Sequence, residues 1–158
     1  MFAALAAGYL VTSFRAPGLT VRFGGRVIAT GAVIAAAGDL LIVLAVWHWG
    51  TGGPLAALVP GLFLLGAGQG LCITPLTTTV LSHADTSTAG SVSGALATAQ
   101  QVGNSIGVAV SGVIFFGLLN HGYAAAFAWS QAQMGVLLLG VTALTLTLLR
   151  RAGAPREA

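Results

Sequence analysis

The chain has 158 residues, of which 56% are hydrophobic and 6% are charged, and its formal net charge is +3. Because a soluble domain carries about 25% charged residues, this composition excludes an ordinary water-exposed surface and predicts a membrane protein. Cys72 is the only cysteine, so a disulfide and a cysteine-based metal site are both excluded within one chain.

The N-terminal segment, residues 1–14, is apolar but short, because crossing the hydrocarbon core takes about 20 apolar residues. It has neither the basic n-region nor the small-residue cleavage site of a signal peptide. We expect the end of a membrane span whose beginning precedes this sequence; a short interfacial or re-entrant helix is the alternative. A basic cytoplasmic loop with Arg15, Arg22 and Arg26 is expected to follow.

The first full span is predicted over residues 27–47, and Asp39 is its only ionisable residue. A charged carboxylate inside a membrane costs roughly 3 kcal/mol, so Asp39 is a candidate for function, here for binding a coupling proton. The alternative is a protonated aspartate that is hydrogen-bonded to a neighbouring helix.

The second span is predicted over residues 55–81. Gly66 and Gly70 have the spacing of small residues that lets two helices approach closely. A nucleotide-binding loop would need a preceding strand and a third glycine at the required spacing, so helix packing is the better interpretation. Pro75 removes a backbone hydrogen bond and predicts a kink, which would serve either as a flex point or to shape the bundle.

The third span, residues 89–119, is the most polar. Its amide and hydroxyl side chains fall on one stripe of a helix, and in lipid such a stripe must face protein or a water-filled cavity. We predict that it lines a substrate path; interhelical hydrogen bonding is the alternative. The stripe consists of Thr98, Gln100, Gln101, Asn104 and Ser105. Two more glycine pairs predict close packing of this span: Gly90 with Gly94, and Gly103 with Gly107.

The fourth span, residues 132–149, is almost purely aliphatic and is expected to face lipid; a tail, residues 150–158, follows it. All six basic residues are arginines in segments that would share one side of a membrane. The opposite loops, around residues 50–54 and 120–131, contain no lysine or arginine. This asymmetry predicts a multi-pass protein of the inner (plasma) membrane with a cytoplasmic C-terminus. Anionic lipid headgroups are therefore the expected partners of the arginines, and no nucleic acid is expected.

The remaining chemistry-bearing residues do not form a catalytic constellation. The histidines His48, His83 and His121 are far apart in sequence and have no acidic partners at metal-ligand spacing. We therefore expect no enzyme, no metal and no cofactor. The aromatic residues are expected to anchor the chain at the outer membrane interface, and stacking against a ligand is the alternative. They are Trp47, Trp49, Tyr123, Phe127 and Trp129.

Three motifs, in this order and spacing, resemble the fourteen-helix drug:proton antiporters of the major facilitator superfamily. The sequence RFGGR at residues 22–26 is similar to their short basic loop between helices ten and eleven. Residues 64–78, LLGAGQGLCITPLTT, resemble their glycine-rich span that ends in a Pro-Leu pair. Residues 89–94 and 100–112, AGSVSG and QQVGNSIGVAVSG, resemble the next span.

The resemblance implies an all-α polytopic bundle comprising the last four full helices of such a transporter and the end of the preceding one. It implies proton-coupled export of small amphiphilic compounds by alternating access, with the missing N-terminal helices, the substrate, protons and the lipid bilayer as partners. Helices twelve and thirteen of that fold line the cavity, whereas eleven, which would carry Asp39, and fourteen pack peripherally. The principal proton-coupling acids lie in earlier helices. The candidates for the substrate path are Gln100, Gln101 and Asn104, followed by Gln69 and Thr74.

Two other hypotheses fit the residues. The first is a small stand-alone transporter or channel that assembles as an oligomer and uses Asp39 as its coupling group. The second is a non-transporting membrane assembly partner of a larger protein. The size of the native protein in membranes would separate both from the exporter.

Overall fold

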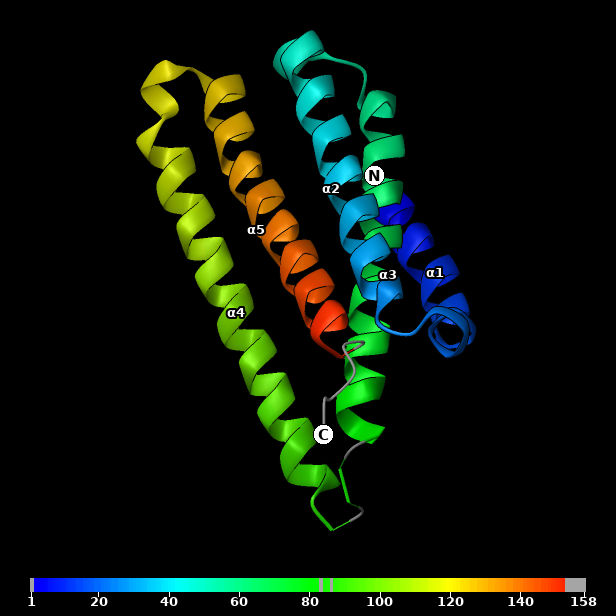
Figure 1. Cartoon of the computed structure of the whole chain (residues 1–158). Coiled ribbons are helices and arrows are strands. Elements are labelled where there is room, and N and C mark those ends of the chain that lie inside the picture. The colour runs from blue at the N-terminus through cyan, green and yellow to red at the C-terminus, as the bar shows by residue number, and fades with distance from the viewer. Residues whose placement is uncertain (1, 83, 86, 153–158) are drawn as a thin grey trace.

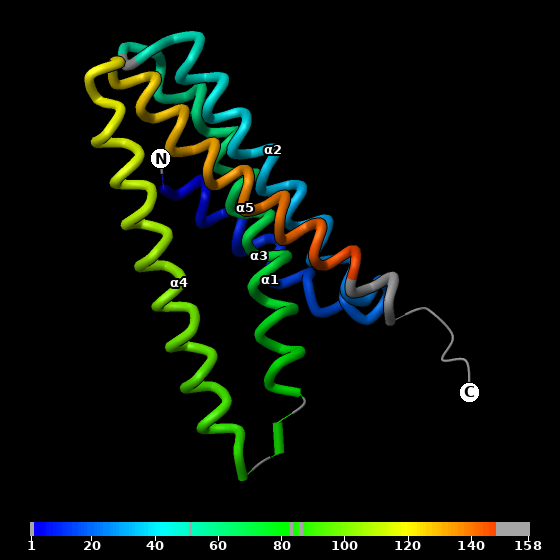
Figure 2. Tube along the Cα trace, turned by 60° about the vertical axis from the view of Figure 1, so that its left-hand side comes forward, coloured from blue at the N-terminus to red at the C-terminus, as the bar shows by residue number. Residues whose placement is uncertain are grey.

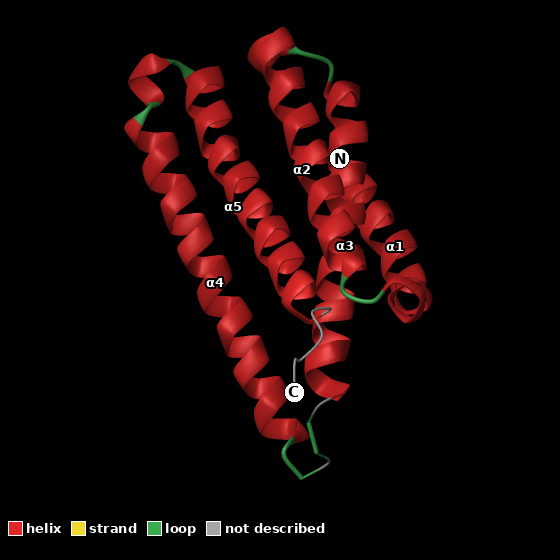
Figure 3. Cartoon of the chain, in the orientation of Figure 1, coloured by secondary structure: helices red, strands yellow, loops and turns green. Residues whose placement is uncertain are grey.

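A computed structural model describes residues 2–82, 84–85 and 87–152 of the chain. They form five long α-helices, three short 3-10 helices and no strand (Figures 1 and 3). The α-helices are α1 (Phe2–Phe23), α2 (Arg26–Trp49), α3 (Val59–Ser82), α4 (Ala89–Gly117) and α5 (Tyr123–Ala152). The 3-10 helices are η1 (Gly50–Gly52), η2 (Leu55–Leu58) and η3 (Leu119–His121).

Four helical segments of the described chain are long and apolar enough to cross a membrane. They are Arg26–Trp49, Leu55–Ser82, Ala89–Gly117 and Tyr123–Thr147. The expected all-α polytopic bundle is therefore confirmed. Helices are the expected form for such segments, because a helix satisfies its backbone polar groups internally, without water.

The helices pack in a row rather than around one centre. Helix α3 packs against α1 and α2, helix α2 also packs against α5, and α5 packs against α4. Helices α3 and α4 diverge from the turn that joins them (Figures 1 and 2). The connections α2–α3 and α4–α5 lie at one end of the bundle, away from the α3–α4 turn (Figure 1).

Glycines bring the backbones of α2 and α3 into direct contact. A Cβ atom added to Gly38 would lie 2.5 Å from the backbone nitrogen of Leu65 and 2.7 Å from the carbonyl oxygen of Gly61. One added to Gly31 would lie 2.9 Å from the carbonyl oxygen of Gly68. Small residues are therefore required along this interface, as is common where membrane helices approach closely.

The predicted packing glycines fall into two groups. Gly66 and Gly70 face α1, where an added Cβ would meet the backbone of Leu5 and the carbonyl oxygen of Tyr9, respectively. On α4, an added Cβ would have no neighbouring atom within 4 Å in the described chain at any of four glycines. These four are Gly90, Gly94, Gly103 and Gly107. The close approach thus concerns α3 with α1 and α2.

Two helix boundaries differ from expectation. Helix α1 continues through Pro17 to Phe23, so Arg15 and Arg22 belong to a helix, and only a tight turn separates α1 from α2. Gly24, with φ of 58°, makes this turn, and its backbone N–H bonds to the carbonyl oxygen of Thr20. A glycine in the left-handed region is a common helix ending, because it has no Cβ to clash.

Helix α5 begins at Tyr123 rather than near residue 132. Gly122, with φ of 98°, ends the preceding 3-10 helix, and three alanines open α5. Alanine is the strongest helix former, and it extends the helix through the polar residues that suggested a loop. Most of the expected loop over residues 120–131 is therefore helical.

Candidate functional site

Asp39 lies on the face of α2 that packs against α5. Its side chain is 3% exposed, and its Oδ1 accepts a hydrogen bond of 2.7 Å from Gln131 Nε2. This bond joins α2 and α5 over 92 residues of sequence. Because the donor is a neutral amide, the contact orients the carboxyl group without compensating a charge on it.

The second carboxyl oxygen of Asp39 lies beside Gly135 of α5. A Cβ atom added to Gly135 would lie 3.6 Å from Oδ2, so the glycine leaves room beside this oxygen. Asp39 also lines a groove of about 440 Å³ between α2 and α5, whose other walls are apolar. Those walls are Val33, Ala36, Ala37, Leu40 and Val43 on α2, and Ala132, Gly135 and Leu139 on α5. The carboxyl group of Asp39 therefore borders a groove that is otherwise apolar.

The polar stripe of α4 lies on a face that no described helix covers. Gln101, Asn104 and Ser105 line a shallow groove of about 420 Å³ together with Val108 and Ala109. None of the described residues of α4 is buried, and the Ser105 hydroxyl bonds to the Gln101 carbonyl oxygen of its own helix. The amide side chains therefore remain available for a ligand or another part of a membrane protein.

The other predicted path residues lie elsewhere. Gln100 is exposed on α4 but does not line the groove with Gln101. On α3, Gln69 is half-buried, and the hydroxyl of Thr74 is 2.9 Å from that of Ser13 on α1. The described chain brings neither of these α3 residues together with the α4 stripe or with Asp39, since α3 and α4 diverge (Figure 2).

Gln131, which the structure places beside Asp39, is a site residue that no sequence pattern singles out. In the sequence Gln131 falls within the expected loop, because tryptophan, serine and glutamine precede the aliphatic run. The alanines at the start of α5 were the available signal that the helix begins earlier. A further pair joins α5 to its other neighbour: Ser111 of α4 donates a hydrogen bond of 3.3 Å to Gln133 Oε1.

The residues predicted to anchor the membrane interface gather at the end that carries the α2–α3 and α4–α5 connections (Figure 1). Trp47, Trp49, Tyr123 and Trp129 are all exposed there.

The described residues contain no group of three His, Cys, Asp or Glu side chains that could hold a metal ion. His83 and Arg156 lie outside the described residues.

Comparison with known proteins finds a similar transporter. Over 98 residues, which is 62% of this chain, the sequence is 39% identical to a "Probable actinorhodin transporter" of Streptomyces coelicolor (strain ATCC BAA-471 / A3(2) / M145). The match covers 17% of the length of that protein. No protein-family profile matches the chain, and no solved structure matches it. The chain is thus similar to part of a transporter and has helices of the length and composition that a membrane span requires.

Proposed function

We propose that this chain is the C-terminal portion of a proton-coupled membrane antiporter of the major facilitator superfamily, in the fourteen-helix group, which exports small amphiphilic compounds by alternating access. The observation that carries the proposal is the sequence similarity of this chain to a transporter. The chain's own helices are also long and apolar enough to span a membrane. The same observation favours transport over catalysis. The proposed location is the bacterial inner membrane, with the C-terminus in the cytoplasm, in keeping with the distribution of arginines.

Asp39 supports proton coupling. It is a carboxyl group inside a helix of membrane-spanning length, it is almost fully buried, and its hydrogen-bond donor is neutral. Ionisable groups at such positions commonly serve proton relays. We propose that Asp39 binds and releases the coupling proton and that Gln131 holds its carboxyl group toward α5.

The polar stripe of α4 supports a path for varied solutes. Gln101, Asn104 and Ser105 offer both donors and acceptors without a fixed charge, beside the apolar Val108 and Ala109. Binding sites for small molecules combine a few polar groups with apolar walls in this way. We propose that this face of α4 contacts the exported compound during transport.

The test of the proposal is transport by the complete protein in proteoliposomes that are loaded with a fluorescent amphiphile, rhodamine 6G. We expect an imposed proton gradient to drive dye movement, and we expect nigericin, which collapses the gradient, to stop it. Dye movement that needs no gradient would contradict proton coupling. An antibody against residues 150–158 that detects only a chain near 15.7 kDa in cell membranes would favour the oligomer or partner hypothesis instead.

Replacing Gln101 by alanine should change substrate preference more than membrane abundance. Some exported compounds would form a hydrogen bond with the Gln101 amide, and for these the loss of that bond should change binding affinity roughly two- to tenfold. The affinity for compounds that form no such bond should stay the same. Export of several amphiphiles would be compared in the same cells. Val102→Ala is the matched control, because Val102 is the next residue on α4, is exposed and does not line the groove. An unchanged export profile at normal abundance would remove Gln101 from the path.

A further inference from the structure

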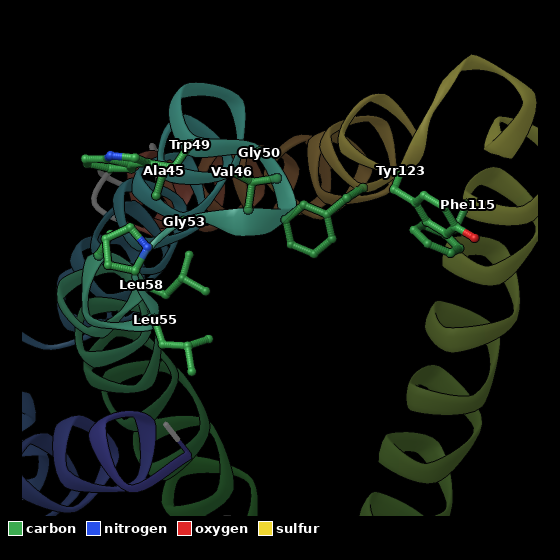
Figure 4. A pocket seen from close by; sticks show the side chains of 12 residues that line it. Ala45, Val46, Trp49, Gly50, Gly53, Leu55, Leu58, Phe115 and Tyr123 are labelled. Atoms are coloured by element: carbon green, nitrogen blue, oxygen red, sulfur yellow. The ribbon is translucent and has the colours of Figure 1, made fainter.

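A further cavity lies at the end of the bundle that carries the α2–α3 and α4–α5 connections. It has a volume of about 320 Å³ and is bounded by the end of α2, by η2, by the end of α4 and by the start of α5. Leu55 and Leu58 face Tyr123 and Phe115 across it (Figure 4). Segments from distant parts of the sequence therefore build its opposite walls.

The walls of this cavity are aromatic and apolar. Four aromatic residues from three helices contribute to it: Trp49, Phe115, Tyr123 and Phe127. Tyr123 remains 67% exposed, so its ring is not consumed by packing within the described chain, whereas the Trp49 ring packs against that of His48, with 4.7 Å between the ring centroids. Aromatic walls can contact an aromatic ring of a ligand through their faces and edges. Such ring contacts add to the binding free energy that comes from burying apolar surface.

No fixed charge lies near the cavity in the sequence. Residues 46–58 and 115–131, which contribute most of the walls, contain no Asp, Glu, Lys or Arg. A charged ligand would lose its hydration there without gaining a counter-ion, and the attraction of a cation to the ring faces is weaker than that cost. The site therefore matches an uncharged ligand.

We propose that this cavity binds an uncharged, planar aromatic molecule of two or three rings. Its volume is at the lower end of the roughly 300–1,000 Å³ of small-molecule sites, which sets the ligand size. A lipid acyl chain could bury apolar surface there, but it would gain no ring stacking from the aromatic walls. The inference concerns binding alone and does not rest on the proposed export.

The test is equilibrium binding of N-phenyl-1-naphthylamine, an uncharged fluorescent aromatic amine, to the complete protein in lipid nanodiscs, with empty nanodiscs subtracted. We expect saturable binding that phenanthrene displaces, whereas the similarly sized cation N-methylacridinium and the fatty acid oleate do not. Because aromatic pairs contribute about 0.5–1.5 kcal/mol, Phe115→Ala should weaken binding roughly two- to tenfold.

Phe14→Ala is the matched control, because Phe14 is a residue of the same type on α1, is 83% exposed and does not line the cavity, whereas Phe116 packs edge-to-face against Phe115. Ala57→Phe is a second test, since it fills the cavity from η2 without removing a ring, and this variant should abolish binding. Equal size-exclusion profiles would show that the variants are folded.

Three results would overturn the proposal. The first is binding that does not saturate above that of empty nanodiscs. The second is equal weakening by Phe115→Ala and Phe14→Ala. The third is displacement by oleate but not by phenanthrene, which would assign the cavity to a lipid chain. All three can be obtained whether or not the protein exports rhodamine 6G, so the failure of this inference and that of the proposed function are distinguishable.

Discussion

Replacing Gly68 by alanine should force α2 away from α3 and destabilise the folded protein by about 3 kcal/mol, the upper part of the range for overpacked cores. An added Cβ would overlap the backbone nitrogen of Ala35 and lie 2.5 Å from the carbonyl oxygen of Gly31. Backbone atoms cannot rotate away, so the helices must separate. The intrinsic helix preference of alanine over glycine, about 1 kcal/mol, has the opposite sign, so a loss of stability would report the clash.

The measurement is thermal unfolding of the purified protein, followed by fluorescence-detected size exclusion. Gly140→Ala is the matched control, because Gly140 is inside α5 and an added Cβ there would meet no atom within 4 Å in the described chain. We expect this control to be neutral or slightly stabilising. A Gly68→Ala protein as stable as the control would contradict the close contact of α2 and α3.

Replacing Asp39 by asparagine should strongly lower gradient-driven export while leaving the protein folded. The amide oxygen of asparagine can accept the Gln131 hydrogen bond in place of Oδ1, so the α2–α5 contact is preserved. Asparagine cannot carry a proton at this position. If Asp39 is the coupling group, export driven by the proton gradient should fall by at least about tenfold.

The matched measurement is rhodamine 6G transport in proteoliposomes, with membrane abundance determined in parallel. Gln131→Leu separates coupling from packing, because it removes the donor but keeps the carboxyl group. We expect this variant to lose roughly 0.6 kcal/mol of stability, the average for a polar contact between membrane helices. It should retain part of the export. Normal gradient-driven export by Asp39→Asn would make Asp39 a structural contact and place proton coupling elsewhere.

The two results bear on different parts of the molecule. Gly68 lies at the contact of α3 with α2, on the side of α2 that faces away from the groove with Asp39. A destabilised Gly68→Ala protein would leave open which group binds the proton. An inactive but folded Asp39→Asn protein would place a functional carboxyl group between α2 and α5.

The fold class and the approximate positions of the helices could be predicted from the sequence. Long apolar runs with few charges leave no other structure in lipid, because backbone polar groups must be satisfied within the segment. The ends of helices were harder to predict. The start of α5 depends on Gly122 and on alanines that follow aromatic and polar residues, and the end of α1 depends on Gly24. Such local signals set where a helix begins and ends, whereas the hydrophobicity of the segment indicates only that a membrane span is present.

The sequence by itself determined that the chain is helical, that it suits a membrane and that Asp39 is chemically unusual. Only the tertiary structure decided which helices meet. Gly66 with Gly70 and Gly103 with Gly107 have the same spacing, yet only the first pair contacts another helix of the described chain. Likewise, Gln131 became the partner of Asp39 only when α5 packed against α2. The physical reason is that lipid favours apolar side chains on all sides of a helix, so hydrophobicity marks the span but not the face that will be covered.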